Sequence, residues 1–560
     1  MNKHLRKLAV ILSIFSVALT SACAQLPTSG EIKTGPNIES GLETDYLYYS
    51  PSGPTEQATQ EEILLGYLNA GTGPQNDYEV ARSFLTQDFA PNWNPNQEVL
   101  VQDGKPTITL TDSNLATVVV PISAKINERG EYESLPSGTT RVIYVSFETE
   151  NGQWRISDAP NLTMVIRPVF DVVFKAYAIY FFDSQDKQLV PDVRWFPSRA
   201  STSTRLVNAL LGGPSEWLDP AVRSAIPAGT KLTLSSVTVA NGVASVDLSS
   251  RALKASANDK QKMQAQIRET LLQLSNVYKV DVTIERSAIE QNSWAYPSSQ
   301  VQFASPVSLV SEGLVHLDVA NSGVISGSKS LIEQVSANDF AMNIDEKIVA
   351  LSSPSGIYLG QLGQLVGTAT LLAPGTGYLP PVVDAQGYTW VVPKSGKRPI
   401  MVFDQLARRV NFVTGWLSQL DRLSFSISSE GSRVVVVTGS RVNSRVYVAA
   451  IVRDNLGLPS FIASPIRPLA APTVFAATWL DSTRIGTLES QASQYVQPLI
   501  TMVGGDTSRL PSYTNGSSII GSGSVTSVFM LDSFGSLYQY RGSSWTKVRD
   551  QITAFGFPAN

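Results

Sequence analysis

The C-terminal part of the chain repeats short β-rich segments, and this repeat constrains the fold more than any other feature of the sequence. From about Ser299 to Asn560 no long helical periodicity occurs, and apolar runs alternate with turns rich in Gly, Ser and Asp. Several units share the order of a strand, an acidic or Ser/Gly turn, a stronger apolar strand and a looser segment. The stronger strands are Gly387–Val392, Arg433–Thr438, Arg484–Leu488 and Gly535–Tyr540.

The spacing of these units favours one architecture. Successive units are about 40 to 55 residues apart, which is close to the length of a propeller blade. We therefore predict an all-β propeller of about five or six blades over residues 300–560. The repeats are degenerate and carry no Trp-Asp signature, so a pair of β-sandwiches is the alternative architecture.

The first 22 residues have the order of a bacterial secretion signal. Three positive charges, Lys3, Arg6 and Lys7, precede the apolar run Leu8–Leu19, and Thr20-Ser21-Ala22 follow it. The run is shorter than the ~20 residues that a membrane-spanning helix needs, and small residues after it mark a cleavage site. We predict that residues 1–22 are a signal peptide that is removed.

Cys23 is the only cysteine of the chain and directly follows these small residues. This position resembles the lipobox of bacterial lipoproteins, in which the thiol is acylated before cleavage, although lipoboxes favour Leu where this chain has Thr20. Diacylglycerol supplies two acyl chains, and two chains anchor a protein stably. We expect lipid attachment at Cys23 on the extracytoplasmic face of the cell membrane. An incidental cysteine in an ordinary signal peptide is the alternative.

Residues 23–54 are predicted to be a tether. The stretch is rich in Ser, Gly, Pro and Thr, as in Leu26–Gly30, and has no sustained periodicity. The folded part of the chain would therefore stand off the membrane.

Composition excludes several classes of protein. The chain has 43 Lys and Arg against 47 Asp and Glu, a net charge of −4, which argues against nucleic acid as a partner. Histidine occurs only at His4 and His316, so a His/Cys metal cluster is excluded together with a disulfide framework. Neither phosphate-binding glycine motif is present, which argues against a nucleotide. We predict no metal and no cofactor.

Residues 55–165 combine helices and strands. A helical face at 63–68 and a second short helix at Tyr78–Leu85 precede the alternating segments Ala116–Ile126, Arg141–Glu148 and Trp154–Ser157. We predict an α+β domain similar to the cone-shaped sheets of the nuclear-transport-factor-like fold.

Residues 170–290 alternate between strand and helix patterns, which predicts an α/β domain. Asn241-Gly242 predicts a hairpin turn, and Ser203 is predicted to cap a helix that ends at Gly212. A later helix, Gln264–Leu274, has one apolar stripe. The stripe consists of Met263, Ile267, Leu271 and Leu274.

This region carries the most specific resemblance. Its segments Ile179–Phe182, Ala209–Pro214, Ala225–Thr230 and Asn241–Ser249 resemble the GerMN domain, found in spore-germination proteins and in the actinobacterial envelope lipoproteins called the LpqB family. In that family a lipobox is followed by an N-terminal α+β domain, a GerMN domain and a C-terminal β-propeller, in the order predicted here.

The resemblance implies a partner class. The LpqB family is associated with the MtrA–MtrB two-component system, in which the lipoprotein is thought to act on the extracytoplasmic part of the sensor histidine kinase. It implies an accessory envelope lipoprotein that influences cell division and cell-wall homeostasis by contact. The residues themselves leave the binding surface unassigned.

The residues that could carry chemistry have simpler explanations. His316 lies in an alternating segment and reads as a strand residue, because no G-x-S-x-G motif accompanies it. Three S-x-x-K matches begin at Ser184, Ser326 and Ser544 and are attributed to chance. Asp247 is expected to close a turn, and Arg194 to form an ion pair before any ligand contact. We predict no catalytic residue.

Aromatic side chains and acids leave one alternative open. Tyr and Trp residues near the tether and the loops could form a binding surface, although we expect most to pack in cores. They are Tyr46, Tyr48, Tyr49, Trp93, Trp195 and Trp217. Paired acids could serve a glycosidase. The alternative function is therefore a cell-wall glycan-binding protein or a carbohydrate-active enzyme with a propeller site.

Overall fold

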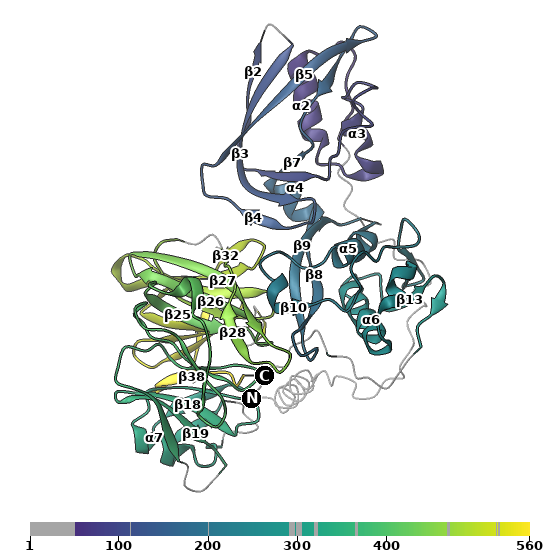
Figure 1. Cartoon of the computed structure of the whole chain (residues 1–560). Coiled ribbons are helices and arrows are strands. Elements are labelled where there is room, and N and C mark those ends of the chain that lie inside the picture. The colour runs from purple at the N-terminus through teal and green to yellow at the C-terminus, as the bar shows by residue number, and fades with distance from the viewer. Residues whose placement is uncertain are drawn as a thin grey trace, which may run out of the picture. The chain divides into compact units, whose positions relative to one another are not determined.

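The computed structural model describes most of the chain from residue 51 onward (Figure 1). The described residues are 51–560 apart from 112–113, 200, 291–296, 298–304, 318–322, 364–367, 467–470, 522, 525–526 and 560. The predictions on the signal peptide, on lipid attachment at Cys23 and on Tyr46, Tyr48 and Tyr49 lie outside these residues. Within them, no helix has both the length and the apolar character needed to cross a membrane.

The N-terminal part is an α+β domain, as predicted. Two helices, α2 (Gln60–Ala70) and α3 (Glu79–Arg82), precede a seven-stranded sheet in which every pair is antiparallel except β1 and β7. The strands are β1 (Glu98–Gln102), β2 (Thr107–Thr111), β3 (Leu115–Asn127), β4 (Tyr132–Ser134), β5 (Thr140–Glu150), β6 (Gln153–Asp158) and β7 (Thr163–Ile166). The predicted second helix, Tyr78–Leu85, is shorter because α3 ends at Arg82.

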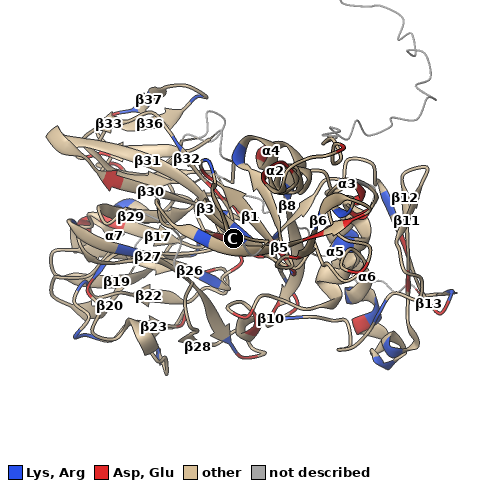
Figure 2. Ribbon diagram, turned by 90° about the horizontal axis from the view of Figure 1, so that it is seen from above, with Lys and Arg blue, Asp and Glu red and all other residues tan. Residues whose placement is uncertain are grey.

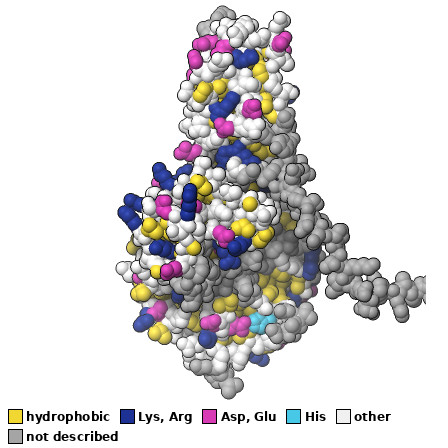
Figure 3. All heavy atoms as spheres, turned by 90° about the vertical axis from the view of Figure 1, so that its right-hand side faces the viewer, with side chains coloured by type: hydrophobic (Ala, Val, Ile, Leu, Met, Phe, Trp, Pro, Cys, Tyr) yellow, Lys and Arg dark blue, Asp and Glu magenta, His cyan; other side chains and the backbone are white. Residues whose placement is uncertain are grey.

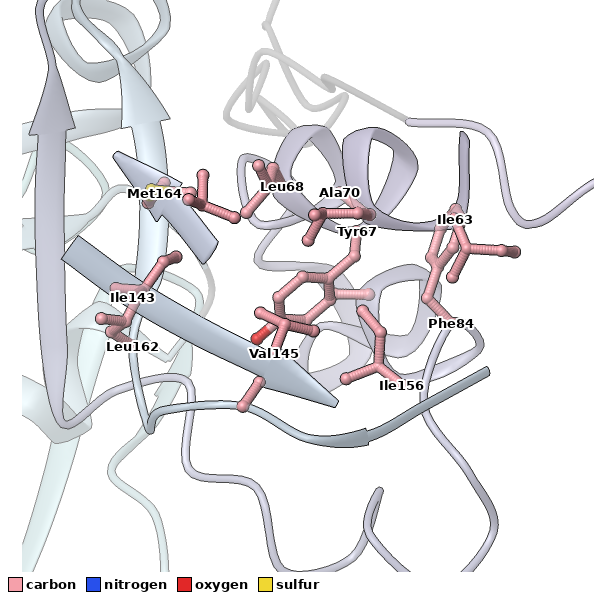
Figure 4. Packing of buried hydrophobic residues seen from close by; sticks show 14 of the residues in the cluster. Ile63, Tyr67, Leu68, Ala70, Phe84, Ile143, Val145, Ile156, Leu162 and Met164 are labelled. Atoms are coloured by element: carbon pink, nitrogen blue, oxygen red, sulfur yellow. The ribbon is translucent and has the colours of Figure 1, made fainter. Parts of the chain in front are cut away.

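Local sequence explains why α2 begins where it does and which face it buries. Thr59 and Glu62 form a capping box, with the Thr59 hydroxyl accepting the Glu62 N–H at 3.3 Å and the Glu62 carboxylate accepting the Thr59 N–H at 2.8 Å. The predicted apolar face is buried and packs on the inner side of β5 and β6 (Figure 4). Labelled contacts of this core include Ile63, Tyr67, Leu68, Ile143, Val145 and Ile156.

The middle part contains two small sheets and two longer helices. Its elements are α4 (Arg167–Val173), β8 (Phe174–Asp183), β9 (Leu189–Pro197), α5 (Thr202–Leu211), β10 (Val222–Arg223), β11 (Thr238–Ala240), β12 (Val243–Leu248), α6 (Ala257–Leu271), β13 (Lys279–Ile284) and β14 (Ser287–Ala288). One sheet has the order β10-β8-β9, and the other has the order β11-β12-β13-β14 with β12 and β13 parallel. Helix α6 buries Met263, Ile267 and Leu271, as the predicted stripe requires. The helix begins earlier than predicted and ends at Leu271, so Leu274 lies beyond it and is half-buried.

Two local predictions in this part have opposite outcomes. The Asn241-Gly242 turn joins β11 to β12 with φ values of 48° and 71°, so the hairpin is confirmed. Ser203 does not cap α5, because the helix begins at Thr202 and Ser203 already lies inside it. The buried Ser203 hydroxyl instead donates to the Val237 carbonyl at 3.4 Å, which satisfies a tertiary acceptor rather than the helix end. The predicted end at Gly212 is correct.

The described C-terminal residues form six separate sheets, each built mainly from consecutive strands, as a propeller requires and a sandwich does not. The strands are β15 (Val307–Val310), β16 (Gly313–His316), β17 (Asp339–Met342), β18 (Ile348–Ser353), β19 (Gly356–Gln361), β20 (Ala369–Pro374), β21 (Val382–Val383), β22 (Thr389–Val391), β23 (Met401–Phe403), β24 (Arg409–Val410), β25 (Arg422–Ile427), β26 (Arg433–Ser440), β27 (Asn443–Arg453), β28 (Pro459–Ile462), β29 (Val474–Trp479), β30 (Arg484–Ser490), β31 (Tyr495–Met502), β32 (Thr507–Arg509), β33 (Tyr513–Thr514), β34 (Gly516–Ile520), β35 (Phe529–Asp532), β36 (Leu537–Tyr540), β37 (Trp545–Arg549) and β38 (Ala554–Gly556). One helix, α7 (Ser328–Val335), interrupts them.

The last strand closes the ring. β38 pairs with β15 near the start of the propeller, with Val307 opposite Gly556 and Leu309 opposite Ala554. The first sheet therefore combines strands from the two ends of the domain. Its closure depends on a contact between residues far apart in the sequence, which no local pattern indicates.

Candidate functional site

Antiparallel order gives the propeller two distinct ends. Turns that follow the first and third strands of a sheet lie at one end, and turns that follow the second strand lie at the other. We call the first the carboxylate end, defined by the turns 343–347, 384–388, 404–408, 428–433, 454–458, 481–484 and 502–506. We call the second the cationic end, defined by the turns 353–356, 392–400, 440–443, 490–495 and 533–536.

Acidic side chains at the carboxylate end close their own hairpins. Asp384, Asp404 and Asp454 each follow a strand and accept two backbone N–H groups, from the residues two and four positions further on. In Asp404 both distances are 2.9 Å. Burial alone would raise the pKa of Asp404, but the N–H and guanidinium of Arg408 lower it on balance. These carboxylates are turn formers rather than a convergent acid pair.

Asp384 and a further acid of this end, Glu430, form buried ion pairs. Asp384 accepts from Arg453 at 2.6 Å and from the Trp390 indole at 2.7 Å, and both partners of the ion pair are nearly inaccessible. Glu430 pairs with Arg433 at 2.7 Å. The Arg433 guanidinium also reaches a carbonyl of the next sheet, that of Ser482, at 2.8 Å. At the carboxylate end, a buried network of ion pairs and hydrogen bonds therefore links neighbouring sheets.

A hollow of about 530 Å³ lies at the carboxylate end beside His316. The His316 Nε2 lies 3.1 Å from the Glu346 carboxylate, while the buried Nδ1 has no hydrogen-bond partner. The described lining residues also include Ser326, Asp345 and Lys347. Histidine is visible at the surface beside acidic side chains (Figure 3). His316 is a residue of strand β16, as predicted, and its Nε2 faces the Glu346 carboxylate rather than a serine hydroxyl.

A second hollow, of about 350 Å³, lies between the β8–β9 turn and two turns of the propeller. Its lining is polar and includes the amides of Gln185, Gln188 and Gln386 beside Tyr388. Asp183 is the one acid among the described lining residues, and it accepts the backbone N–H groups of Lys187 and Gln188 at 2.7 and 2.9 Å. Burial raises the pKa of Asp183, although these hydrogen bonds oppose the shift. The hollow lacks the second carboxyl group that a glycosidase requires.

The described residues offer no metal site, since no three His, Cys, Asp or Glu side chains among them are grouped to hold an ion. Acidic and basic residues are interspersed along the ribbon (Figure 2). Many of the acids pair with nearby cations, as Asp186 does with both Arg223 and Lys262 at 2.6 Å. These charges therefore compensate one another locally.

The other singled-out residues have structural roles. Asp247 accepts from the Thr283 hydroxyl at 2.6 Å and from the Arg286 N–H at 2.8 Å, which confirms turn closure. Arg194 is buried and pairs with Asp192 at 2.7 Å and with Glu131, which confirms an ion pair. Of the tryptophans, Trp93 and Trp195 are buried, and Trp217 is half-buried. The Ser184 hydroxyl is buried without a hydrogen-bond partner among the described residues, so it is not bonded to Lys187.

Sequence reasoning missed a cluster centred on Asp506. The Asp506 carboxylate accepts from the Tyr132 hydroxyl and from Arg167, and the Trp195 indole donates to the Gly504 carbonyl at 2.8 Å. Burial raises the pKa of Tyr132, and the neighbouring Asp506 adds to the shift. These residues are hundreds of positions apart in the chain, so only the folded structure brings them together.

The comparisons with known proteins agree with this three-part organisation. Residues 53–171 match the family model for the lipoprotein LpqB N-terminal domain. Residues 178–290 match the model for sporulation and spore germination, and residues 312–559 match the lipoprotein LpqB beta-propeller domain. The three matches follow one another in the order that the sequence predicted.

Individual relatives point the same way. Lipoprotein LpqB of Cutibacterium acnes is 30% identical over 276 residues, which cover 49% of this chain and 46% of the relative. Lipoprotein LpqB of Thermobifida fusca is 29% identical over 49% of this chain and 45% of the relative. The chain thus aligns with somewhat less than half the length of each. Among solved structures, the first GerMN domain of GerM from Bacillus subtilis is 27% identical over 22% of this chain and 94% of its own, with a TM-score of 0.19.

The fold and these matches define a three-part protein built from an N-terminal α+β domain, a GerMN domain and a β-propeller. The chain belongs to the LpqB lipoprotein family. That family is named as a lipoprotein family and not for a catalytic activity.

Proposed function

We propose that this protein is a lipid-anchored accessory regulator on the extracytoplasmic face of the cell membrane. Cys23 would carry the lipid, and the folded domains would contact the extracytoplasmic domain of the sensor histidine kinase of an MtrA–MtrB two-component system. Through that contact the protein would influence cell division and cell-wall homeostasis. Membership of the LpqB lipoprotein family is the observation that carries the proposal.

Polar side chains at the propeller turns already take part in hydrogen bonds and ion pairs within the fold. This supports a role in binding a protein partner rather than in catalysis. Asp384, Asp404 and Glu430 at the propeller turns accept backbone N–H groups or pair with arginines. Tethering would make a weak interface sufficient, because a short flexible linker gives an effective concentration in roughly the millimolar range. The unique position of Cys23 after small residues supports the anchor.

The test combines intact-mass analysis with crosslinking in native membranes. The expected result is a mature chain that begins at Cys23, carries a lipid and crosslinks to the kinase. A Cys23→Ala variant should lose both the lipid mass and the crosslink, whereas an Ala24→Ser variant, which keeps the thiol, should lose neither. An unlipidated wild type would refute the anchor, and a lipidated chain that never crosslinks to the kinase would refute the partner.

A Thr20→Leu variant sharpens the anchoring step. Leucine is the residue that lipoboxes favour at this position, so the variant should be processed at least as completely as the wild type. The measurement is the ratio of unprocessed to processed chain by mass. A fall in processing would show that the segment is not read as a lipobox.

Glycan binding is a second candidate, favoured by the hollow beside Tyr388. The Gln386 side-chain oxygen is buried there without a hydrogen-bond partner, and neighbouring amides and an aromatic ring suit a polar ring-shaped ligand. Calorimetric titration with soluble wall fragments tests it, with Gln386→Ala expected to weaken binding. No heat of binding for the wild type would remove this candidate.

A further inference from the structure

The cationic end of the propeller carries an unneutralised group of basic side chains. The turn 392–400 contains Lys394, Lys397 and Arg398, and the hairpin segment 438–445 contains Arg441 and Arg445; neither segment contains an acid. Four of these five side chains are exposed, and Arg398 is half-buried. None of the five forms a salt bridge with a described carboxylate.

Backbone pairing places these two segments side by side. The Arg422 N–H donates to the Lys394 carbonyl at 2.7 Å, and Arg422 pairs in register with Thr438, which pairs with Arg445. The Arg441 guanidinium lies over the ring of Phe475, 4.4 Å from its centroid. The two basic segments therefore form a strip across two sheets that reaches a third. The exposed Asp421 lies between the segments, where its carboxylate accepts the Gly396 N–H at 2.9 Å and its carbonyl accepts the Gly439 N–H at 2.8 Å.

A buried arginine adds to the positive charge beneath this strip. The Arg422 guanidinium donates to the carbonyls of Pro393, Ser395, Arg398 and Leu417 at 2.8 to 3.2 Å. Burial lowers the pKa of Arg422, with Asp421 opposing the shift, yet an arginine of this kind stays protonated. Its carbonyl contacts hold the turn 392–400 in shape without neutralising the charge by a direct ion pair.

Apolar side chains project from separate turns at the same end. Val442 is 81% exposed at the tip between β26 and β27, and Phe534 is 77% exposed between β35 and β36. Tyr495, at the turn between β30 and β31, is also exposed. These tips belong to three different sheets. Val442 is flanked by Arg441, whereas Phe534 follows Asp532 and Tyr495 has no basic neighbour in its turn. Isolated apolar tips suit a soft headgroup layer, whereas a rigid protein partner favours a continuous apolar patch.

We propose that the cationic end of the propeller docks on an anionic membrane surface. In this contact, side chains of the propeller bind the membrane directly, in addition to the lipid expected on Cys23. Charge complementarity carries the argument, because the chain as a whole is acidic, with a net charge of −4, and an anionic surface would repel it without such a local strip. The expected binding partner is thus a layer of anionic lipid headgroups. If the vesicles do not bind, an acidic protein surface is the alternative partner.

The test measures binding to vesicles by the chain from residue 24 onward, which keeps every described residue and lacks the lipidation site. The probes are vesicles of phosphatidylglycerol mixed with phosphatidylcholine, and vesicles of phosphatidylcholine alone. Each basic residue near an anionic surface strengthens binding by about fivefold. We therefore expect binding to the mixed vesicles only, and a Lys394→Glu/Lys397→Glu variant should bind them at least about 25-fold more weakly.

A control variant makes the same change in charge elsewhere. Lys279→Glu/Lys347→Glu alters two exposed lysines that lie outside the cationic end, one on β13 and one in the turn after β17. This variant should bind the mixed vesicles within about threefold of the wild type, because the effect of charge falls off within a Debye length. Equal weakening in both variants, or no wild-type binding to mixed vesicles, would overturn the proposal. Circular dichroism and thermal melting confirm that each variant is folded.

Discussion

The two ends of the propeller differ in the charged side chains that they leave without an ion-pair partner, although Asp532 closes its own turn at the cationic end as the acids of the other end do. At the carboxylate end Asp384, Asp404 and Asp454 accept backbone N–H groups, and buried arginines complete the network. At the cationic end Lys394 and Lys397 extend from a turn that contains no acid. The first pattern stabilises the fold, and the second leaves charge available to a partner.

This difference teaches where a contact surface should be sought in such a chain. An acid whose carboxylate accepts backbone N–H groups in its own turn has a structural role, so its presence says little about function. The five basic side chains of the cationic end form no salt bridge with a described carboxylate, and repulsion between them costs free energy. The cationic end is therefore the better candidate for an interface, and substitutions at the two ends should have different consequences.

The largest effect on stability is expected from Asp384→Ala at the carboxylate end. The substitution leaves the buried Arg453 without its carboxylate and removes the acceptor of the Trp390 indole. Breaking one partner of a buried pair costs about 3–5 kcal/mol in the free energy of unfolding. Chemical denaturation measures the change. A loss below about 1 kcal/mol would show that the pair is not part of the framework of the propeller.

A smaller, pH-dependent effect is expected from Asp339→Asn. Asp339 begins β17 on the side of the cationic end, and burial raises its pKa to about 6 although the Phe340 N–H opposes the shift. Since the pKa is higher in the folded state than in the unfolded chain, the stabilisation is fully present below about pH 4 and is lost as the pH rises through about 6.

The asparagine variant removes that dependence. At pH 7 it should be more stable than the wild type by about 3 kcal/mol, and at pH 4 the two should be nearly equal. Denaturant titrations at the two pH values give the comparison. A difference between the proteins that is the same at both pH values would contradict the assignment to Asp339.

The smallest effect is expected from Arg408→Ala. Arg408 pairs with Asp404 at 2.7 Å, but its side chain is 74% exposed. Exposed ion pairs contribute about 0–1 kcal/mol, and the two backbone N–H bonds to Asp404 remain in the variant. Thermal melting should therefore change little. A large loss of stability would mean that the ion pairs of the carboxylate end, and not its turn closures, hold that end together.

Features set by neighbouring residues could be predicted from the sequence. The strand at Ala116–Ile126 lies within β3, whose burial alternates residue by residue, and Asn241-Gly242 forms its hairpin turn. Each depends on side-chain periodicity or on a positive φ that two adjacent residues supply. The same holds for the apolar stripe of α6.

Features that depend on distant residues could not be predicted. The sequence predicted an ion pair for Arg194 but not its partner Glu131, which lies 63 positions away. The cap assigned to Ser203 was wrong because α5 begins at Thr202, and the Ser203 hydroxyl donates to the carbonyl of Val237, 34 positions away. The strip that contains Lys394 and Arg445 exists only because β-sheet pairing brings two turns together. Charge clusters of this kind have no signature in the linear sequence.

The most direct test of the contrast between the ends compares two labelled positions on one sheet. In the chain from residue 24 onward, which has no cysteine, Val442→Cys and Leu456→Cys each supply one thiol for an environment-sensitive dye. The native side chains are 81% and 83% exposed, but Val442 lies at the cationic end and Leu456 at the carboxylate end. Vesicles containing phosphatidylglycerol should shift the emission of the dye at position 442 to shorter wavelength and leave that at 456 unchanged. Equal shifts at both positions, or a shift at 456 alone, would contradict the account.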